Sequence, residues 1–331
     1  MLTGKWRFPQ PRADDHGPAA GSGGDRAARA ARRAPWTAVP PSALVLTGVF
    51  SVQFGAGLAA KLFTQIAPAA VTGLRLWTSA AVMAAVGAGP LRNAITGLVR
   101  RRAWRDAAVV AVFGVTLAVM NFSIYQSFAR IPLGISVTVE FLGPLGLAVA
   151  TSRRLLDLLW VALAGSGVAL LAHGGLSTTA GRGTVAIGLA FALLSALSWA
   201  GYILLSRATG QRFGGSTGLT IAMLAAAVVI TPVGVAAGGK TLLRPDILLA
   251  GVGIGLLSSI IPYSLEMEAL RRIPPRVFGI WMSLEPAVAA LVGLVLLGQS
   301  LAVREWLAVG CVMVACAGAS RGAREPQTPE A

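Results

Sequence analysis

The sequence predicts an all-α integral membrane protein with ten transmembrane helices, and three observations lead to this prediction. The chain has 331 residues, of which 55% are hydrophobic and only 12% are charged, whereas a soluble domain keeps roughly a quarter of its residues charged. The apolar residues fall in blocks of roughly 18–24, the length that crosses a ~30 Å hydrocarbon core. These blocks are apolar on all sides, whereas a helix at the surface of a soluble protein shows one apolar stripe.

The ten apolar blocks define the predicted helices, with short polar or basic connections between them. The helices cover residues 40–61, 68–88, 107–128, 132–151, 155–173, 184–206, 216–237, 247–270, 275–297 and 302–320. Two connections are very short, at Ala129–Pro132 and Arg271–Pro274. A proline suits the first turn of the helix that follows, so the third helix is separate from the fourth and the eighth from the ninth.

Lysine and arginine are distributed unevenly between the connections. Of 28 such residues, 21 lie in the two tails and alternate connections, six lie in the others, and Arg75 lies inside a span. Basic residues gather on the cytoplasmic side of membrane proteins. We therefore expect a multi-pass protein of the bacterial cytoplasmic (inner) membrane with both termini in the cytoplasm. The formal charge of +15 follows from this topology, and we expect no nucleic-acid partner.

The ends of the chain differ in composition from the apolar blocks. Residues 1–39 are rich in Ala, Gly, Pro and Arg and have too few bulky apolar residues to form a core. We expect a disordered, basic cytoplasmic tail there and no secretory signal. The predicted organisation continues with an N-terminal five-helix repeat at 40–173, a connecting loop at 174–183, a C-terminal five-helix repeat at 184–320 and a cytoplasmic tail at 321–331.

Two short motifs recur at a constant distance along the chain. The tripeptide Arg130–Pro132 matches Arg272–Pro274 at an offset of 142 residues, and Pro144 matches Pro286 at the same offset. Each half holds five predicted helices, an odd number, so the second half must enter the membrane the opposite way up. Inverted repeats of this kind occur in alternating-access carriers, in which the substrate binds near the bilayer midplane between the repeats.

Two acidic residues lie deep in predicted spans, each close to a proline. Glu140 lies about eight residues, or ~12 Å, into the fourth span, and Glu285 lies about ten residues into the ninth. A charged side chain at such a depth costs about 2.5–3.5 kcal/mol or more, so it faces an aqueous cavity or a partner. We expect Pro144, Pro286 and Pro262 to break their helices, because proline has no N–H to donate, and we expect Pro286 to push Glu285 away from helical geometry. The two acids either form a transport site or are satisfied by neighbouring helices.

The other polar residues within spans allow more than one role. Arg75 can form a structural ion pair with Glu140, or it can bind a substrate carboxylate through two hydrogen bonds. Glu268 precedes two arginines by three and four residues, which indicates an ion pair at the cytoplasmic surface. Glu266 lies one turn deeper and is a candidate site residue. Further candidates, which either line a cavity or simply pack, are Gln53, Asn121, Tyr125, Gln126, Trp199, Tyr202 and Tyr263.

Motifs of soluble enzymes, metal sites and cofactor sites are absent or misplaced. The glycine-rich segment Gly251–Gly255 opens an apolar span and follows no strand, so close helix packing explains it better than nucleotide binding. Cys311 and Cys316 lie in the last span without disulfide or metal-ligand spacing. The two histidines have no catalytic partners, and no phosphate loop occurs. We therefore expect no enzyme activity, no cofactor, no metal and no ATP-driven pump.

Several motifs, taken together, resemble one family. They are Met120–Tyr125, Ile131–Ile135, Glu140–Leu145, Pro262–Met267 and Met282–Ala287. The chain is similar in these motifs to the threonine/homoserine exporter branch (EamA-type) of the drug/metabolite transporter superfamily, and the similarity covers residues 42–320 in a 5+5 layout. The resemblance implies efflux of threonine, homoserine and related amino acids, driven by proton antiport, and a role for Glu266. The basic tail, Glu268 and the arginines after it depart from the family pattern.

The residues and the resemblance lead to one hypothesis with three alternatives. The hypothesis is alternating access between the N-terminal and C-terminal halves, with Glu140 or Glu285 binding the substrate ammonium and Arg75 or freed backbone amides binding its carboxylate. A carboxyl group removed from water favours its protonated form, so one of these acids can also carry the antiported proton. The alternatives are a broader drug or metabolite exporter of the same fold, a passive channel and a membrane-embedded enzyme. The sequence leaves the oligomeric state open.

Overall fold

The structure, a computed structural model, describes residues 39–152, 156–173, 181–214 and 216–322. The chain divides into two units, Met1–Pro40 and Pro41–Ala331, and the helices described below belong to the second. All regular structure in the described residues is helical, which confirms the all-α prediction. Most of the predicted tails, all but residues 39, 321 and 322, and most of the loop 174–183 lie outside the described residues.

Nine spans among the described residues are long and apolar enough to cross a membrane. Six of them are continuous: α2 (Pro41–Leu62), α3 (Pro68–Val86), α5 (Trp104–Phe128), α9 (Arg182–Gly210), α10 (Thr217–Gly238), which leads into the short 3₁₀ turn η2 (Gly239–Leu243), and α15 (Val303–Gly322). Three are interrupted: α6 (Leu133–Glu140) with α7 (Leu142–Ala150), α11 (Pro245–Gly255) with the π-helical turn η3 (Leu256–Ile260) and α12 (Ile261–Leu270), and α13 (Pro275–Met282) with α14 (Glu285–Leu297).

The fifth predicted helix is present as α8 (Leu156–His173). Its described apolar stretch, Leu158–Leu171, is shorter than the other spans. Helices therefore occur at all ten predicted positions, and nine of them have the length and composition of a membrane span. The role of α8 as a tenth span and the inverted orientation of the two halves stay predictions.

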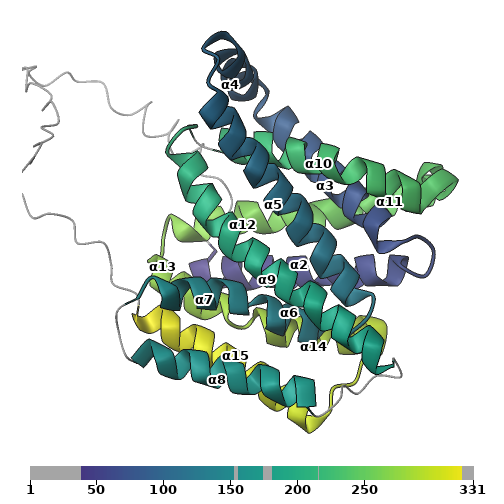
Figure 1. The fold of residues 1–331 in the computed structure, drawn as a ribbon, viewed down its shortest axis with the longest axis vertical. Helices are drawn as coiled ribbons and strands as arrows, with labels where there is room; N and C mark the ends of the chain where they lie inside the picture. Colours follow the sequence, from purple (N-terminus) through teal and green to yellow (C-terminus); the bar gives the residue numbers. More distant parts are fainter. Residues whose placement is uncertain (1–38, 153–155, 174–180, 215, 323–331) are drawn as a thin grey trace, which may run out of the picture. The chain divides into compact units, whose positions relative to one another are not determined.

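One helix was not expected from the sequence. The connection around residues 92–105 contains α4 (Ala88–Arg100), at the top of Figure 1. No helix was predicted in this basic connection, because α4 is amphipathic rather than apolar all round. A search for long apolar blocks passes over a helix with a single apolar stripe.

Helices from the first half of the sequence pack mainly against helices from the second half. Within the second unit, α3 and α5 pack against α10, and α8 packs against α15 (Figure 1). One buried core joins α3, α5 and α10 through residues such as Leu76, Phe113 and Met223. Another joins α6, α8 and α9 through Ile135, Leu171 and Ala192. The two sequence halves are therefore not separate bodies.

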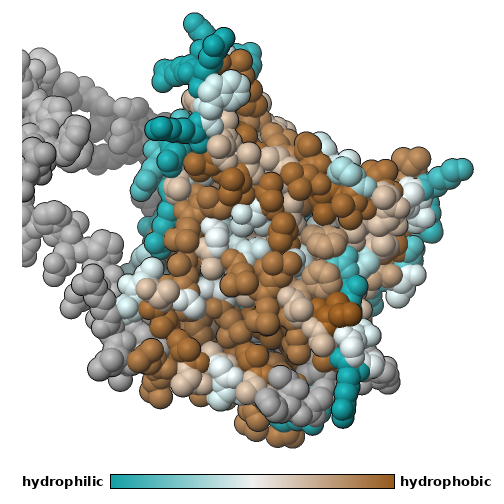
Figure 2. All heavy atoms as spheres, viewed as in Figure 1, coloured by the Kyte–Doolittle hydropathy of each residue, from teal (hydrophilic) through white to brown (hydrophobic). Residues whose placement is uncertain are grey.

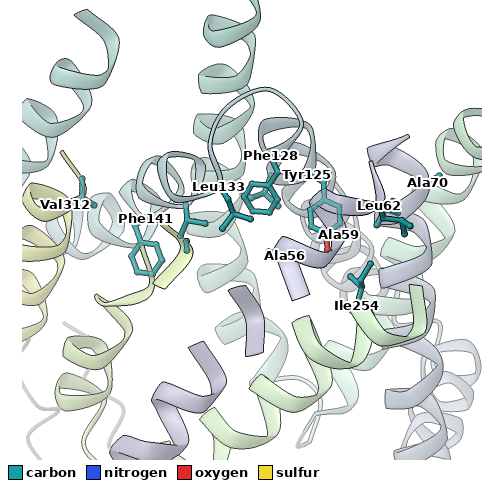
Figure 3. Close-up of a cluster of buried hydrophobic side chains, with 14 of the residues drawn as sticks. Ala56, Ala59, Leu62, Ala70, Tyr125, Phe128, Leu133, Phe141, Ile254 and Val312 are labelled. Carbon is teal, nitrogen blue, oxygen red and sulfur yellow. The ribbon is translucent and has the colours of Figure 1, made fainter. Parts of the chain in front are cut away.

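A third buried core connects these two groups of helices. Figure 3 shows part of it, with Ala56 and Leu62 from α2, Tyr125 from α5, Leu133 from α6 and Ile254 from α11 among its members. Helices α3 and α11, which also contribute to this core, are in close contact. A Cβ atom at Gly251 would lie 2.8 Å from Leu74 Cβ, and one at Gly255 would lie 2.6 Å from Thr78 Cβ. The packing role predicted for this glycine segment is thus confirmed at Gly251 and Gly255, whereas Gly253 meets no neighbour.

The outer faces of the spans carry large apolar side chains. Leu197, Leu249, Val295 and Leu307 are each more than half exposed, and Figure 2 shows hydrophobic residues over most of the visible face. Contiguous apolar surface of this extent suits a lipid environment rather than water. The cysteines Cys311 and Cys316 are free, as predicted.

Candidate functional site

The repeated motif of the sequence has the same local geometry in its two copies. Helix α6 covers 133–140 and helix α13 covers 275–282, so both ends agree with the offset of 142 residues. The residues before them, Pro132 and Pro274, have φ/ψ of −53°/141° and −58°/144°. The residues after them, Phe141 and Ser283, have φ/ψ of −64°/−13° and −65°/−11°. Each copy therefore starts at a proline and is interrupted after eight residues.

The two acids lie on opposite sides of the interruptions in their spans. Glu140 is the last residue of α6, whereas Glu285 is the first residue of α14. The second interruption falls at Ser283 and Leu284, so the expectation that Pro286 forces Glu285 out of helical geometry is wrong. Proline is well tolerated in the first turn of a helix, where its missing N–H would have no partner.

A cavity of about 190 Å³ lies where the interrupted helices meet. Nine of the candidate residues line it: Gln53, Arg75, Asn121, Glu140, Trp199, Tyr202, Tyr263, Glu266 and Glu285. They come from both halves of the sequence. The cavity thus brings together three carboxyl groups and one guanidinium, in segments where ionised groups are costly.

Glu140 shares the hydroxyl of Ser195 with a backbone carbonyl. Ser195 Oγ lies 2.5 Å from Glu140 Oε1 and 3.1 Å from the Met120 carbonyl oxygen. A hydroxyl group has one proton, so Ser195 donates to only one of these oxygens at a time. Both contacts are hydrogen bonds only when Glu140 is protonated and donates to Ser195, which then donates to Met120. The number of hydrogen bonds that Ser195 makes therefore differs between the two protonation states of Glu140.

Glu285 has one hydrogen-bonded oxygen and one without a partner. Gln53 Nε2 donates to Glu285 Oε1 at 2.8 Å, and both side chains are buried. Within the described part of the chain, Glu285 Oε2 and Gln53 Oε1 have no hydrogen-bond partner although both atoms are buried. A buried polar atom without a partner costs about 1–3 kcal/mol, so this pair of oxygens is suited to a proton or to a bound donor.

Arg75 is held by a backbone carbonyl that a proline leaves free. Its Nη2 donates to the Ser258 carbonyl oxygen at 3.1 Å, and its guanidinium lies 5.5 Å from the centre of the Tyr125 ring. Pro262 has no N–H for the carbonyl four residues earlier, which is that of Ser258. Arg75 Nε is buried and finds no partner among the described residues. The proline therefore supplies the acceptor that orients Arg75 and leaves one of its donors for another group.

The same interruption frees a second carbonyl. Ile261 N–H bonds to the Leu256 carbonyl in the wider π-helical pattern, and Ser51 Oγ donates to the Leu257 carbonyl oxygen at 2.7 Å. The η3 turn is thus tied to α2 and α3 through its backbone. Glu266 follows on α12 and lies against α2, where its Cγ would be 3.6 Å from a Cβ atom at Gly48.

The alternatives left open by the sequence are partly resolved. No ion pair between Arg75 and Glu140 occurs among the described residues, so the structural pair is wrong as a direct contact. The Tyr125 ring packs against the Arg75 guanidinium. Tyr125 is fully buried and does not line the cavity. Gln126 accepts a hydrogen bond from Arg130 instead of facing the cavity.

Two further polar residues are engaged locally. Asn121 lines the cavity and also donates to the Leu117 carbonyl of its own helix at 2.8 Å. Glu268 pairs with Arg272 and lies 3.6 Å from Arg271 Nη1, so the ion pair predicted for Glu268 is confirmed. Glu268 therefore belongs to the end of α12 and not to the cavity.

A second cavity, of about 340 Å³, lies between α7 and α13. Its walls are mainly apolar, with Arg276 as the charged member, and it shares Trp199 and Met282 with the central cavity. The Trp199 indole meets the Phe141 ring edge-on at 5.0 Å between ring centres. The side chains of Trp199 and Met282, which line both cavities, therefore lie between them.

Sequence reasoning missed the residues that position the charged groups. Ser195, Ser258 and Ser51 are single small polar residues in apolar spans, with no pattern to mark them. The role of Ser258 could have been predicted, because Ser258 lies four residues before Pro262 and its carbonyl therefore loses its usual donor. The described residues include no cluster of three His, Cys, Asp or Glu side chains suited to a metal ion.

Apolar spans, interrupted helices and a charged cavity at their meeting point define a class of protein: a multi-pass membrane transporter of small molecules. Residues 186–321 match the EamA-like transporter family. The threonine/homoserine exporter RhtA of Escherichia coli (strain K12) is 36% identical over 285 residues, covering 86% of this chain and 92% of that protein. The protein of the same name from Salmonella typhimurium (strain LT2) is 36% identical over 288 residues, covering 87% and 94%. The chain belongs to the EamA-like transporter family, in the threonine/homoserine exporter branch of the drug/metabolite transporter superfamily.

More distant relatives agree with this assignment. The uncharacterized inner membrane transporter YedA of Escherichia coli (strain K12) is 31% identical over 198 residues, covering 56% of this chain and 61% of that protein. One solved crystal structure matches 83% of this chain and 96% of its own, with a TM-score of 0.53 at 18% identity. At that identity the likeness concerns the fold alone.

Proposed function

We propose that this protein exports small amino acids of the threonine and homoserine kind across the bacterial inner membrane, by proton antiport with alternating access. The observation that carries the proposal is the central cavity, in which three carboxyl groups and one arginine from the spans meet. The relatives named as threonine/homoserine exporters support the choice of substrate.

The size of the cavity favours a small solute. Its volume is about 190 Å³, whereas sites for drug-sized ligands occupy about 300–1,000 Å³. A threonine-sized molecule fits this space better than a drug does. We therefore prefer an amino-acid exporter to the broader drug or metabolite exporter of the same fold.

The polar groups of the cavity complement an amino-acid zwitterion. Arg75 Nε is a buried donor without a partner, and Glu285 Oε2 is a buried acceptor without a partner among the described residues. In our proposal Arg75 binds the substrate carboxylate, and Glu285, with Glu266 nearby, binds the ammonium group. Tyr125 and the Ser258 carbonyl hold Arg75 in place for this contact.

Glu285 is our first choice for the exchanged proton, because its free oxygen can hold a proton when no substrate is bound. Glu140 is the second choice. A proton on Glu140 would be donated to Ser195, which would then donate to the Met120 carbonyl, so this proton would link α6, α9 and α5. The acid would then hold either a proton or the substrate ammonium but not both, which is the requirement of an antiporter.

The packing suggests how access alternates. Helices α6 and α14 are in close contact, since a Cβ atom at Gly134 would lie 2.6 Å from Ala290 Cα, whereas α7 and α13 leave the cavity of about 340 Å³ between them. In the topology predicted from the charge distribution, the closed end faces outward and the open end faces the cytoplasm. The moving groups then combine helices of both repeats, in place of the N-terminal and C-terminal halves expected from the sequence.

Transport in vesicles tests the proposal. Inside-out vesicles that contain the protein should accumulate labelled threonine or homoserine when the interior is made acidic, and a protonophore should reduce the uptake to that of empty vesicles. A passive channel would equilibrate the solute without using the gradient. Accumulation of bulky drugs in preference to amino acids would instead support the broader exporter.

Reporter fusions test the orientation. Fusions near residues 178 and 241 should report the periplasm, and fusions at both termini should report the cytoplasm, because 21 of the 28 basic residues lie on the predicted inner side. A cytoplasmic signal from either internal fusion would contradict the predicted topology.

A further inference from the structure

The amphipathic helix α4 has an apolar stripe that the protein does not bury. Its apolar residues recur at the helical spacing of i, i+3, i+4, i+7 and i+8, and they are Leu91, Ala94, Ile95, Leu98 and Val99. None of the residues of α4 is buried, and Val99 is 72% exposed. A cavity of about 680 Å³ also separates α4 from the ends of α9 and α10. The described protein therefore covers the stripe only in part, and its residues Ile95 and Val99 are exposed.

The position of α4 in the chain places this stripe at a membrane surface. Helix α4 connects α3 to α5, and both of those helices are long and apolar enough to span the membrane. A short helix between the ends of two neighbouring spans lies at the boundary of lipid and water. Amphipathic helices in that position bury their apolar face at the level of the headgroups.

Arginines surround the polar side of α4. Five of them lie between residues 92 and 105, all exposed: Arg92, Arg100, Arg101, Arg102 and Arg105. The first three line a crevice of about 620 Å³. Arg102 has a left-handed φ of 47°, so the chain turns sharply into α5 and keeps the arginines together. Arg212 pairs with Asp106 at 3.1 Å, whereas the salt bridges found in the described chain include none of the five.

We propose that α4 is an acidic-phospholipid site. Its apolar stripe lies among the acyl chains, close to the headgroups. The crevice lined by Arg92, Arg100 and Arg101 binds the phosphate of an anionic lipid such as phosphatidylglycerol. The charges are complementary, and arginine side chains are long enough to reach the phosphates while their stems cover apolar surface. Figure 2 shows hydrophilic residues gathered around α4, next to the hydrophobic surface of the spans.

Fluorescence quenching tests the orientation of the helix. The full chain, carrying Cys311→Ala and Cys316→Ala, receives one labelled cysteine, either Ile95→Cys on the stripe or Asn93→Cys on the opposite side. In vesicles of phosphatidylcholine and phosphatidylglycerol, lipids brominated on their acyl chains should quench the label at 95 several-fold more than the label at 93. Equal quenching at the two positions, or stronger quenching at 93, would overturn the proposal.

Lipid selectivity tests the arginine crevice. Bromine is placed on phosphatidylglycerol alone or on phosphatidylcholine alone, and the ratio of quenching measures the preference of the site for the anionic lipid. The triple variant Arg92→Gln, Arg100→Gln, Arg101→Gln should lower this ratio by about fivefold or more, and the matched lysine triple variant should retain most of it. Unchanged selectivity in the glutamine variant, or an equal loss in the lysine variant, would show that charge is not what α4 contributes.

Discussion

The two copies of the repeated motif, α6–α7 and α13–α14, have nearly the same backbone and different surroundings. Both begin at a proline and are interrupted after eight residues. In the first copy α6 is buried over Leu133–Val139, whereas no residue of α13 is buried. In the second copy the buried part is α14, which includes Glu285 and Pro286. Burial is therefore concentrated where α6 and α14 meet, and the other two segments, α7 and α13, have few or no buried residues.

Small residues account for part of this difference. Gly134 allows close contact of α6 with Ala290, and Gly143 allows the backbone of α7 to approach the Ala196 carbonyl. The equivalent positions at the offset of 142 residues carry Arg276 and Glu285. The comparison teaches that the same positions of one backbone motif can be glycines in close contact in one copy and carry charged side chains in the other.

The largest expected effect comes from removing the acids of both copies together. Glu140→Gln with Glu285→Gln should reduce proton-driven threonine export to the level of empty vesicles, because no buried acid then couples the proton to the substrate. Glu285→Gln alone should keep the protein folded and abolish the dependence on the gradient. Because Arg75 does not pair directly with Glu140, Glu140→Gln should also remain folded. Normal proton-driven export by the double variant, measured in inside-out vesicles, would contradict the mechanism.

Packing around the first copy gives the next largest effect. Gly143→Ala should destabilise the protein by about 1–3 kcal/mol or more, because its Cβ would collide with the backbone of Ala196, which cannot rotate away. Gly146→Ala is the matched control on the same helix, since a Cβ there meets no neighbour. Thermal unfolding in detergent should separate the two variants, and equal stabilities would mean that α7 and α9 are not in close contact.

A third interrupted span extends the comparison between the halves. Helix α5 ends at Phe128 and α12 ends at Leu270, again 142 residues apart, yet α5 is continuous where its counterpart contains η3. Pro262→Ala should give the Ser258 carbonyl a backbone donor and weaken its bond to Arg75. Hydrogen bonds to charged groups contribute about 1.5–3 kcal/mol, so we expect about a tenfold loss of threonine transport without loss of stability. Pro232→Ala, inside α10 and away from the cavity, is the control that should retain transport.

The smallest effect concerns how the two copies begin. Gln299 Oε1 accepts a hydrogen bond from Leu133 N–H at 2.9 Å, whereas the equivalent residue of the second copy, Pro275, has no N–H to satisfy. Gln299→Ala should therefore lower the free energy of unfolding by about 1 kcal/mol, measured by denaturant titration, and Gln299→Glu should keep the acceptor. An unchanged stability in Gln299→Ala would show that water replaces the cap.

Much of the fold could be predicted because membrane helices are specified by simple quantities. Block length and overall apolarity located all ten helical positions, and Pro132 and Pro274 marked two helix starts. Prediction failed for α4, whose apolar residues form a stripe. It also failed to anticipate that the two halves interdigitate, since the choice of partner depends on small residues such as Gly134 that show no periodic pattern.

The candidate site was predictable where a residue is costly in lipid. Glu140, Glu285 and Arg75 stand out because ionised groups are rare in apolar spans. Ser195 does not stand out, since a serine inside a helix commonly bonds to its own backbone. Which carboxyl group meets which partner depends on the rotation of neighbouring helices, and a single sequence contains little information on that rotation.

The backbone anchors of η3 have a consequence for how substrate preference can change. Ser51 and Arg75 bond to the carbonyl oxygens of Leu257 and Ser258, so the attachment of this segment to α2 and α3 does not depend on the side chains that follow it. Tyr263 and Glu266, which line the cavity, can therefore be exchanged while the frame that carries them stays attached. A new solute specificity is accessible here through one or two substitutions, without rebuilding the helix bundle.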